Sequence, residues 1–175
     1  MHKVSRIAVL IFVIGIHVSF TLPEKEKIQW ISFEALAEQY KLNPKPIIID
    51  VYTTWCGWCK VMDNTTYANA ELSQYVNEKY YAVKLNAETK SSIIFNGKKY
   101  NYNPNYRVNE LTLYLTGGNL SFPHTVLLAG SDAQPAPLPG YLKPRQLEGP
   151  IKFYGERADS IGTFVSFNSK LHKKW

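Results

Sequence analysis

The chain has 175 residues, which suits one compact domain with a hydrophobic core. Hydrophobic residues make up 45% and charged residues 19%, a composition that is ordinary for a globular protein. The formal charge of +6 comes from scattered lysines and arginines. No nucleic-acid-binding motif accompanies this charge, and we expect no nucleic-acid partner.

The N-terminus has the composition of an export signal. Residues 1–6, MHKVSR, are basic, and residues 7–20, IAVLIFVIGIHVSF, are almost purely apolar. This run is short for a membrane span, which needs about 20 residues. We predict a signal peptide over residues 1–22, with an uncleaved N-terminal membrane anchor as the alternative. The domain at residues 23–175 is then expected to be periplasmic or secreted.

The first predicted elements are a helix, a strand and a second helix. Residues 30–40 carry apolar side chains at helical spacing, with Ser32 as a candidate N-cap, and Pro44 and Pro46 follow the end of this helix. Residues 46–53, PIIIDVYT, predict a buried strand because they contain three consecutive isoleucines. The segment CGWCKVMDN follows at once and indicates the start of a helix.

The middle of the chain begins with a helix and a strand. Asn69 is a candidate N-cap for a helix over residues 70–80, and residues 80–86, YYAVKLN, predict a second strand. Residues 88–107 are rich in Asn, Tyr and Lys. We interpret them as a loop with a short strand or turn at FNGKKY.

The C-terminal part alternates in the same way. We predict a short helix carrying Val108, Leu111 and Leu115, a strand at residues 125–130, an edge strand at residues 135–140 and a short last helix over residues 161–171. Pro144 is placed to open a further helix. Pro150 lies inside that helical pattern and is expected to break or kink it, because its ring meets the carbonyl of Gln146.

Both cysteines of the chain lie in one window, TTWCGWCK, and each follows a tryptophan. If the strand ends near Thr53 and the helix begins near Cys56, unpaired backbone N–H groups and the helix dipole would stabilise a Cys56 thiolate. Cys59 would then lie one turn further on the same face, and Gly57 is expected to allow a tight turn. This arrangement predicts thiol–disulfide exchange, in which Cys56 reacts first and Cys59 resolves the mixed disulfide.

Other uses of this cysteine pair fit the sequence less well. A bridge between Cys56 and Cys59 closes a tiny loop and would restrain the unfolded chain very little. A zinc site needs about four ligands, and a c-type haem site needs a histidine where Lys60 stands. Two inert buried cysteines remain an alternative, against which the strand-to-helix context argues. We predict no metal and no organic cofactor, because the thiols themselves carry the electrons.

Residues 30–154 resemble the thioredoxin superfamily, in particular its exported thiol:disulfide oxidoreductases. The resemblance is carried in order by IIIDVYTTWCGWCK, AVKLNAE, SFPHTVLLA and LPGYLKPRQL. It implies an α/β fold in which helices flank both faces of a central mixed β-sheet. Compared with a minimal thioredoxin, the segment at about 88–118 is an insert before the cis-proline strand, and the last helix is a short C-terminal extension.

The resemblance implies a role for three further residues. Asp50 matches the buried acid that exchanges a proton with the second cysteine, and Lys84 matches its electrostatic partner. A carboxylate in such an apolar strand also requires a partner or a raised pKa. Pro123 matches the cis-proline that faces the cysteine pair. The alternatives are a solvent-facing aspartate, a surface lysine and a trans loop proline.

The remaining candidate residues would contact the substrate. Trp55, Gly57 and Trp58 surround the reactive sulfur, and the two tryptophans offer flat apolar surfaces to a polypeptide. The backbone of Phe122 could pair with an extended substrate. Its large side chain replaces a small or β-branched residue and puts the substrate range in doubt. The tyrosines of the insert could form a binding rim or simply pack.

The resemblance thus implies a thiol:disulfide oxidoreductase that acts on proteins with disulfides or thiols. We predict a monomeric reductase that receives electrons from a membrane donor. An oxidase or isomerase is the alternative within the family. A protein-binding module on a thioredoxin scaffold, in which the CxxC motif has no redox turnover, is the alternative from another class.

Overall fold

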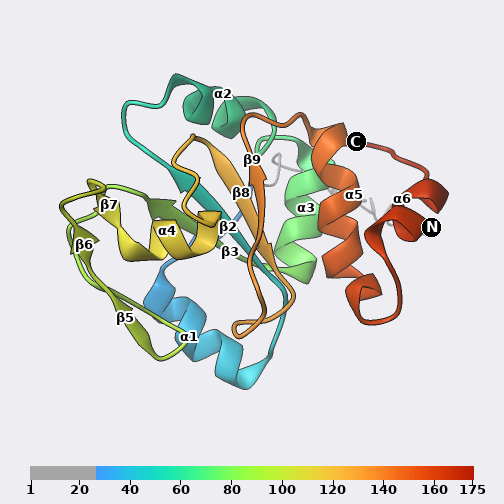
Figure 1. Ribbon diagram of the computed structural model, residues 1–175. Coiled ribbons are helices and arrows are strands. Elements are labelled where there is room, and N and C mark those ends of the chain that lie inside the picture. Colours follow the sequence, from blue (N-terminus) through green and yellow to red (C-terminus); the bar gives the residue numbers. More distant parts are fainter. Residues whose placement is uncertain (1–26) are drawn as a thin grey trace, which may run out of the picture.

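The centre of the molecule is a five-stranded mixed sheet (Figure 1). The computed structural model describes residues 27–175, so the predicted signal segment lies outside the described residues. The strand order is β1 (Trp30–Ile31), β3 (Tyr81–Asn86), β2 (Ile47–Tyr52), β8 (His124–Leu128) and β9 (Ala136–Pro139). The first three strands are parallel, and β8 pairs antiparallel with both β2 and β9. The proline-containing strand β9 lies at an edge, as predicted.

Helices cover both faces of the sheet, which confirms the predicted fold class. They are α1 (Phe33–Leu42), α2 (Gly57–Thr65), α3 (Ala70–Lys79), α4 (Glu110–Thr116) and α5 (Pro144–Gly155). Ile47 and Ile49 of β2 belong to a core formed with α1 and α4. Ile48 belongs to a second core with α2, α3 and α5. Successive side chains of a strand alternate between its faces, so the isoleucine run supplies both cores.

Side-chain caps fix where several helices begin. Ser32 accepts a hydrogen bond from the Ala35 N–H at the start of α1, and Asn69 accepts one from the Leu72 N–H at the start of α3. Both predicted N-caps are confirmed. Trp30, which opened the predicted helical pattern, instead belongs to the short edge strand β1.

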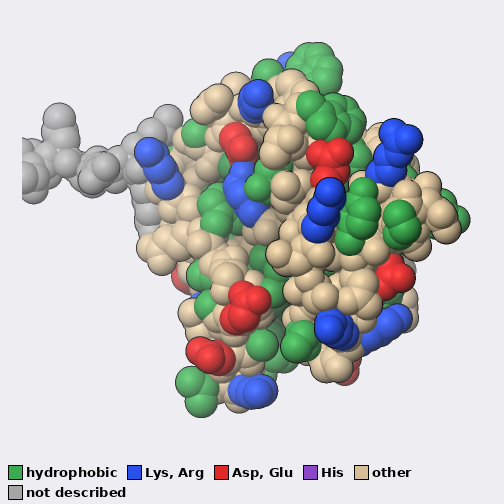
Figure 2. Space-filling view, turned by 90° about the vertical axis from the view of Figure 1, so that its left-hand side faces the viewer, with side chains coloured by type: hydrophobic (Ala, Val, Ile, Leu, Met, Phe, Trp, Pro, Cys, Tyr) green, Lys and Arg blue, Asp and Glu red, His purple; other side chains and the backbone are tan. Residues whose placement is uncertain are grey.

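The segment between β3 and β8 contains two small hairpins and α4. Strands β4 (Ile93–Phe95) and β5 (Lys98–Tyr100) are joined by Asn96 and Gly97, both at positive φ, as a two-residue hairpin turn requires. Strand β6 (Tyr102–Asn103) pairs with β7 (Val108–Asn109). Figure 2 shows lysines and arginines scattered among acidic and hydrophobic side chains on the face turned to the viewer.

In this half of the chain, the predicted helical position of Val108 and the predicted break at Pro150 are wrong. Val108 lies in β7 rather than in a helix, because the Asn109 side chain caps the Leu111 N–H and places the start of α4 after Asn109. Pro150 does not break α5, which continues to Gly155. Leu147 and Ile151 on either side of Pro150 are fully buried, and their packing holds both halves of the helix against the sheet.

A C-terminal extension covers α5. It contains a short 3-10 helix, η1 (Ala158–Ser160), and α6 (Phe164–Lys170), whose Phe164 and Phe167 rings each lie 5.6 Å from the ring of Phe153. This confirms the predicted helical extension. Within residues 27–175, no helix has the length and apolar character needed to cross a membrane.

A buried carboxylate fastens the end of the chain. Glu148 of α5 is 0% exposed and accepts hydrogen bonds from Lys152 Nζ at 2.8 Å and from the N–H groups of Lys174 and Trp175 at 2.8 and 2.9 Å. The Trp175 ring lies 5.6 Å from the Tyr75 ring of α3. The last residues are therefore part of the folded domain.

Candidate active site

The cysteine pair lies where β2 passes into α2. Cys56 has an extended backbone and is the N-cap of α2, and its Sγ accepts a hydrogen bond of 3.0 Å from the Cys59 N–H. The two residues form a disulfide, with their Cα atoms 5.3 Å apart, and both are buried. The predicted position of Cys56 at a helix N-terminus, with Cys59 one turn further, is confirmed. The same N–H group would stabilise negative charge on a reduced Cys56.

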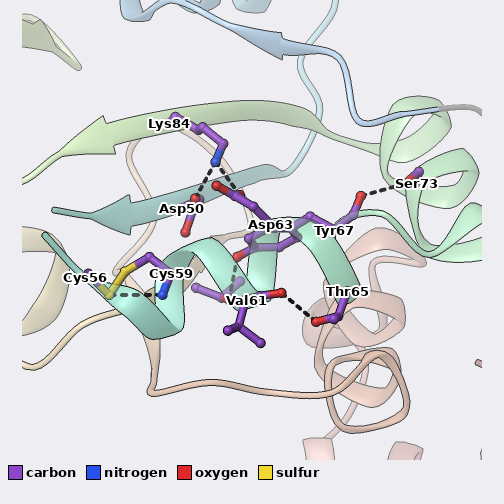
Figure 3. Close-up of polar contacts among 10 residues, drawn as sticks. Asp50, Cys56, Cys59, Val61, Asp63, Thr65, Tyr67, Ser73 and Lys84 are labelled. Carbon is purple, nitrogen blue, oxygen red and sulfur yellow. Dashed lines mark hydrogen bonds and ion pairs between the residues drawn. A yellow bond between two sulfur atoms is a disulfide. The ribbon is translucent and has the colours of Figure 1, made fainter. Parts of the chain in front are cut away.

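Asp50 lies under α2 on the central strand (Figure 3). It is 2% exposed, and the parallel register of β2 and β3 places it opposite Lys84, whose Nζ is 3.0 Å from Asp50 Oδ2. Burial raises the pKa of Asp50 to about 6, although the positive charge of Lys84 opposes the rise. The sequence-based pairing of Asp50 with Lys84 is thus present in the structure.

Lys84 serves two carboxylates. Its Nζ also forms an ion pair with Asp63 of α2, which Figure 3 shows beside Asp50. Partial burial lowers the pKa of Lys84, but the charges of Asp50 and Asp63 and their hydrogen bonds outweigh this effect and raise it overall. Asp63 was not among the candidate residues predicted from the sequence. Its only signal is its position four residues, about one helical turn, after Cys59.

Two hydroxyl groups lie on the other side of Asp50. Thr125 of β8 is opposite Asp50 in the antiparallel register, and its Oγ1 is 2.8 Å from the Tyr67 hydroxyl. Both residues are buried. Neither was a candidate in the sequence, because nothing local distinguishes them from ordinary core residues.

Aromatic side chains surround the disulfide at the surface. Trp55 is 67% and Trp58 62% exposed. The Trp55 ring lies 6.1 Å from the Phe122 ring, and its indole N–H donates to Glu88 Oε1 at 3.1 Å. The Trp58 ring lies 5.4 Å from the ring of Tyr141. The structure therefore brings Trp55, Trp58 and Phe122 together around the site, as expected.

A shallow hollow opens between these rings. It is lined by Trp58, Phe122, Gly140 and Tyr141. The Phe122–Pro123 peptide bond is cis, and the Pro123 carbonyl accepts a hydrogen bond of 2.8 Å from the Gly140 N–H. The cis-proline loop and the turn after β9 are thus joined at this hollow, which Trp58 also lines.

Gly57 differs from its expected role. It is the first residue of α2, and its backbone is not in the left-handed region that favours glycine. A Cβ at this position would meet no atom within 4 Å. The chain turns into the helix through the extended backbone of Cys56, so the turn does not require a glycine at position 57.

The fold and the cysteine pair define a thioredoxin-fold protein with a CXXC disulfide. A family model described as Thioredox_DsbH, protein of unknown function, DUF255, matches residues 20–152. The chain belongs to this thioredoxin-like family.

Two relatives match the chain over part of its length. The thiol:disulfide interchange protein DsbD of Campylobacter jejuni is 30% identical over 71 residues, which are 40% of this chain and 12% of that protein. The chloroplastic thioredoxin Y of Oryza sativa subsp. japonica is 33% identical over 62 residues, which are 35% of each chain. The chain therefore spans only a small share of the relatives' own length.

Solved structures share the fold. A DsbH oxidoreductase has a TM-score of 0.53 at 19% identity, with 81% of this chain and 94% of that chain covered. A thioredoxin-fold protein from Helicobacter pylori has a TM-score of 0.56 at 19% identity, with 73% and 80% covered. A putative disulphide-isomerase from Bacteroides thetaiotaomicron has a TM-score of 0.53 at 19% identity, with 79% and 99% covered.

Proposed function

We propose that the protein is a thiol:disulfide oxidoreductase that reduces protein disulfides outside the cytoplasm. One observation carries this proposal. The Cys56 sulfur caps α2, receives the N–H of Cys59 and is bonded to the Cys59 sulfur, between two exposed tryptophans. A purely structural bridge across three residues would stabilise the fold very little. A redox-active pair at a surface rimmed with aromatic rings explains the same arrangement.

The exchange would proceed in two balanced steps from the reduced protein. The Cys56 thiolate attacks one sulfur of a client disulfide, so a mixed disulfide forms and one client thiolate leaves. The Cys59 thiolate then attacks the Cys56 sulfur, which forms the Cys56–Cys59 disulfide seen here and releases the second client thiolate. Two electrons pass from the protein to the client. A dithiol donor must return two electrons to close the cycle.

Asp50 and Lys84 would handle the proton of Cys59. A carboxylate with a pKa of about 6 can accept a proton near neutral pH and release it again. Lys84 is 26% exposed and connects this buried group to the surface. Both residues are on strands of the rigid sheet, which keeps them in place while the sulfur bonds change.

The client chain would lie across Phe122 and the hollow. Within residues 27–175, the backbone N–H and C=O of Phe122 take part in no strand pairing, so an extended client segment can hydrogen-bond to them. Trp55, Gly57 and Trp58 would form the opposite wall. The open space above Gly57 leaves room for a client backbone.

The reducing direction and the location are parts of the same proposal. The basic and apolar residues 1–20 support export, and an electron donor in the membrane would then re-reduce the disulfide. The buried Asp50 supports a reductase, since a proton acceptor under the helix that carries Cys59 would help this thiol to attack. We expect a monomer, because each chain holds a complete site.

The redox potential of the cysteine pair tests this proposal. We expect equilibration with glutathione to give a value near that of thioredoxin, about −270 mV, and the reduced protein to reduce insulin disulfides. A value near about −120 mV would reverse the direction and indicate an oxidase. The Cys56→Ser variant should lose insulin reduction, whereas Cys59→Ser should accumulate the mixed disulfide. Full biological activity of Cys56→Ser would instead support a binding module without redox turnover.

A further inference from the structure

A buried histidine follows the Phe122 loop, residues 119–123, at the start of β8. His124 is the first residue of this strand and is 1% exposed. The sheet register pairs it with Val51 of β2 and Pro139 of β9, so both cross-strand partners are apolar. Its Nδ1 lies 2.6 Å from the carbonyl oxygen of the exposed Ser121, three residues earlier. This contact joins the buried strand to the surface loop that precedes it.

The proton in this contact can be assigned from the chemistry of the two groups. A backbone carbonyl oxygen only accepts hydrogen bonds, so the donor is the Nδ1–H of the His124 imidazole. Burial lowers the pKa of His124, although the hydrogen bond to Ser121 opposes this change. The ring is therefore neutral near neutral pH, with its one proton on Nδ1 and none on Nε2.

Two further hydrogen bonds fix the Phe122 loop. The Ser121 N–H donates to the side-chain oxygen of Asn119 at 2.9 Å, and the Pro123 carbonyl accepts from the Gly140 N–H at 2.8 Å. Ser121 is thus bonded through both its N–H and its carbonyl. The backbone of Phe122 stands between these fixed points and makes no hydrogen bond of its own in the described part of the chain.

We infer that His124 is a positioning residue for client binding: its hydrogen bond to the Ser121 carbonyl fixes the Phe122 loop in the shape that presents the free Phe122 backbone to an extended polypeptide. This inference rests on the proposed function. Because His124 is buried, it would touch neither the client nor the reacting sulfurs and would act through the loop. A loop fixed beforehand lowers the conformational entropy that is lost when the client binds.

This hydrogen bond should matter for polypeptide clients more than for small disulfides. An extended client can pair with the Phe122 backbone and contact the hollow lined by Trp58, Phe122, Gly140 and Tyr141. A small molecule such as hydroxyethyl disulfide has no peptide backbone and needs only the sulfur of Cys56. The ratio of kcat/KM for the two kinds of substrate therefore reports on the docking edge separately from the chemistry of the cysteines.

The first experiment compares the reduction of insulin with that of hydroxyethyl disulfide. His124→Leu removes the donor, so we expect the KM for insulin to rise about fivefold, the effect of one hydrogen bond, and kcat to change less. The ratio of kcat/KM for insulin to that for hydroxyethyl disulfide should fall by a similar factor. An unchanged ratio, including an equal loss with both substrates, would overturn the proposal, because the histidine would then serve only the stability of the fold.

Two amide variants distinguish the hydrogen bond from the size of the side chain. The N–H of an asparagine side chain stands at the same bond position as Nδ1 of histidine, whereas that of glutamine stands one bond further out. Glutamine is nearer to histidine in volume. We therefore expect the insulin KM of His124→Asn to lie nearer to wild type than that of His124→Gln. The reverse order would mean that the site needs only a filled volume, which contradicts the proposal.

Val126→Ala is the control for lost stability. Val126 is fully buried in the same strand and on the same face as His124, two residues further from the loop. This variant should lower the free energy of unfolding and keep the wild-type ratio of kcat/KM for the two substrates. A fall of this ratio in Val126→Ala equal to that in His124→Leu would refute a specific role of the histidine.

A last measurement needs no turnover. Nitrogen NMR of the His124 ring in the oxidised protein should show a protonated Nδ1 and an unprotonated Nε2, and the opposite tautomer contradicts the hydrogen bond to Ser121. If wild type reduces neither insulin nor hydroxyethyl disulfide, the proposed function fails, and the positioning role fails with it. If wild type reduces both and His124→Leu keeps the wild-type ratio, the proposed function stands and the positioning role alone fails.

Discussion

Asp50 and Lys84 lie opposite each other on neighbouring parallel strands, with 3.0 Å between carboxylate and ammonium, yet the pKa of Asp50 is raised to about 6. An ion pair alone would lower it. Burial of the carboxylate therefore outweighs its partner, and Lys84 must be shared with Asp63. The buried acid is held in a state in which it can both take and give a proton near neutral pH.

This balance predicts that Asp50→Asn stabilises the protein at high pH. The folded pKa of about 6 exceeds the ordinary value of 3.8. Below about pH 3.8, Asp50 is protonated in both the folded and the unfolded state, so the free energy of unfolding does not depend on its ionisation. As the pH rises through 6, wild type loses about 3 kcal/mol relative to the variant, since the folded state resists ionisation. Urea unfolding of the oxidised proteins at pH 3.5 and 8 measures this difference, and equal stabilities at pH 8 would contradict it.

The two neighbours of Asp50 should shift its pKa in opposite directions. Lys84→Met removes the charge and hydrogen bond that favour ionisation, so the pKa of Asp50 should rise further. Asp63→Asn removes a repelling charge, so the pKa of Asp50 should fall. Carboxyl NMR titration of the two variants gives the answer directly, with Glu88→Gln, which alters a carboxylate bonded to Trp55, as the control. Shifts of the same sign would refute the sharing of Lys84.

Glu148→Gln should destabilise the protein at neutral pH. Burial raises the pKa of Glu148, but hydrogen bonds from Lys152, Trp175 and Lys174 outweigh it, so the pKa is lowered. The stabilising effect is therefore present above the ordinary pKa and disappears as the pH falls through the lowered value. We expect a loss of about 3 kcal/mol at pH 7, typical of breaking a buried pair. Denaturation midpoints measure it, and the exposed Glu38→Gln should show no such loss.

Alanine substitution of two glycines near the site should affect the stability of the protein to different extents. Gly57→Ala meets open space at a helix start, so its stability should stay within about 0.5 kcal/mol of wild type. Gly140→Ala forces a side chain to a φ of 83° and should lose about 1–2 kcal/mol. Thermal unfolding compares the pair. A larger loss of stability in Gly57→Ala than in Gly140→Ala would contradict the backbone conformation described for Gly57 at the start of α2.

Much of the fold could be predicted from the sequence because its signals are local. Ser32 and Asn69 cap helices through contacts three residues away, and the isoleucines of β2 show a strand buried on both faces. The same holds for the cysteines, because the N-cap position depends only on where the strand ends. Pro150 misled the prediction because the packing of its neighbours overrides the local preference.

The rest of the site depends on contacts between distant segments. Tyr67 follows the end of α2 and meets Thr125 of β8, 58 residues further along the chain, and Lys84 of β3 meets Asp63 of α2, which lies 21 residues before it. Glu148 was missed for the same reason, since its partners include backbone N–H groups 26 and 27 residues away. Periodicity and motif spacing carry no information on such contacts.

The two tryptophans beside the disulfide have a practical consequence. Trp55 directly precedes one bonded cysteine and Trp58 directly precedes the other, and both indole rings are largely in solvent. Tryptophan fluorescence is sensitive to a neighbouring disulfide. Trp30 and Trp175 lie on other elements, so their fluorescence should stay constant when the disulfide is reduced. The intrinsic fluorescence of Trp55 and Trp58 should therefore report whether the disulfide is oxidised or reduced, and turnover can be followed without an attached dye.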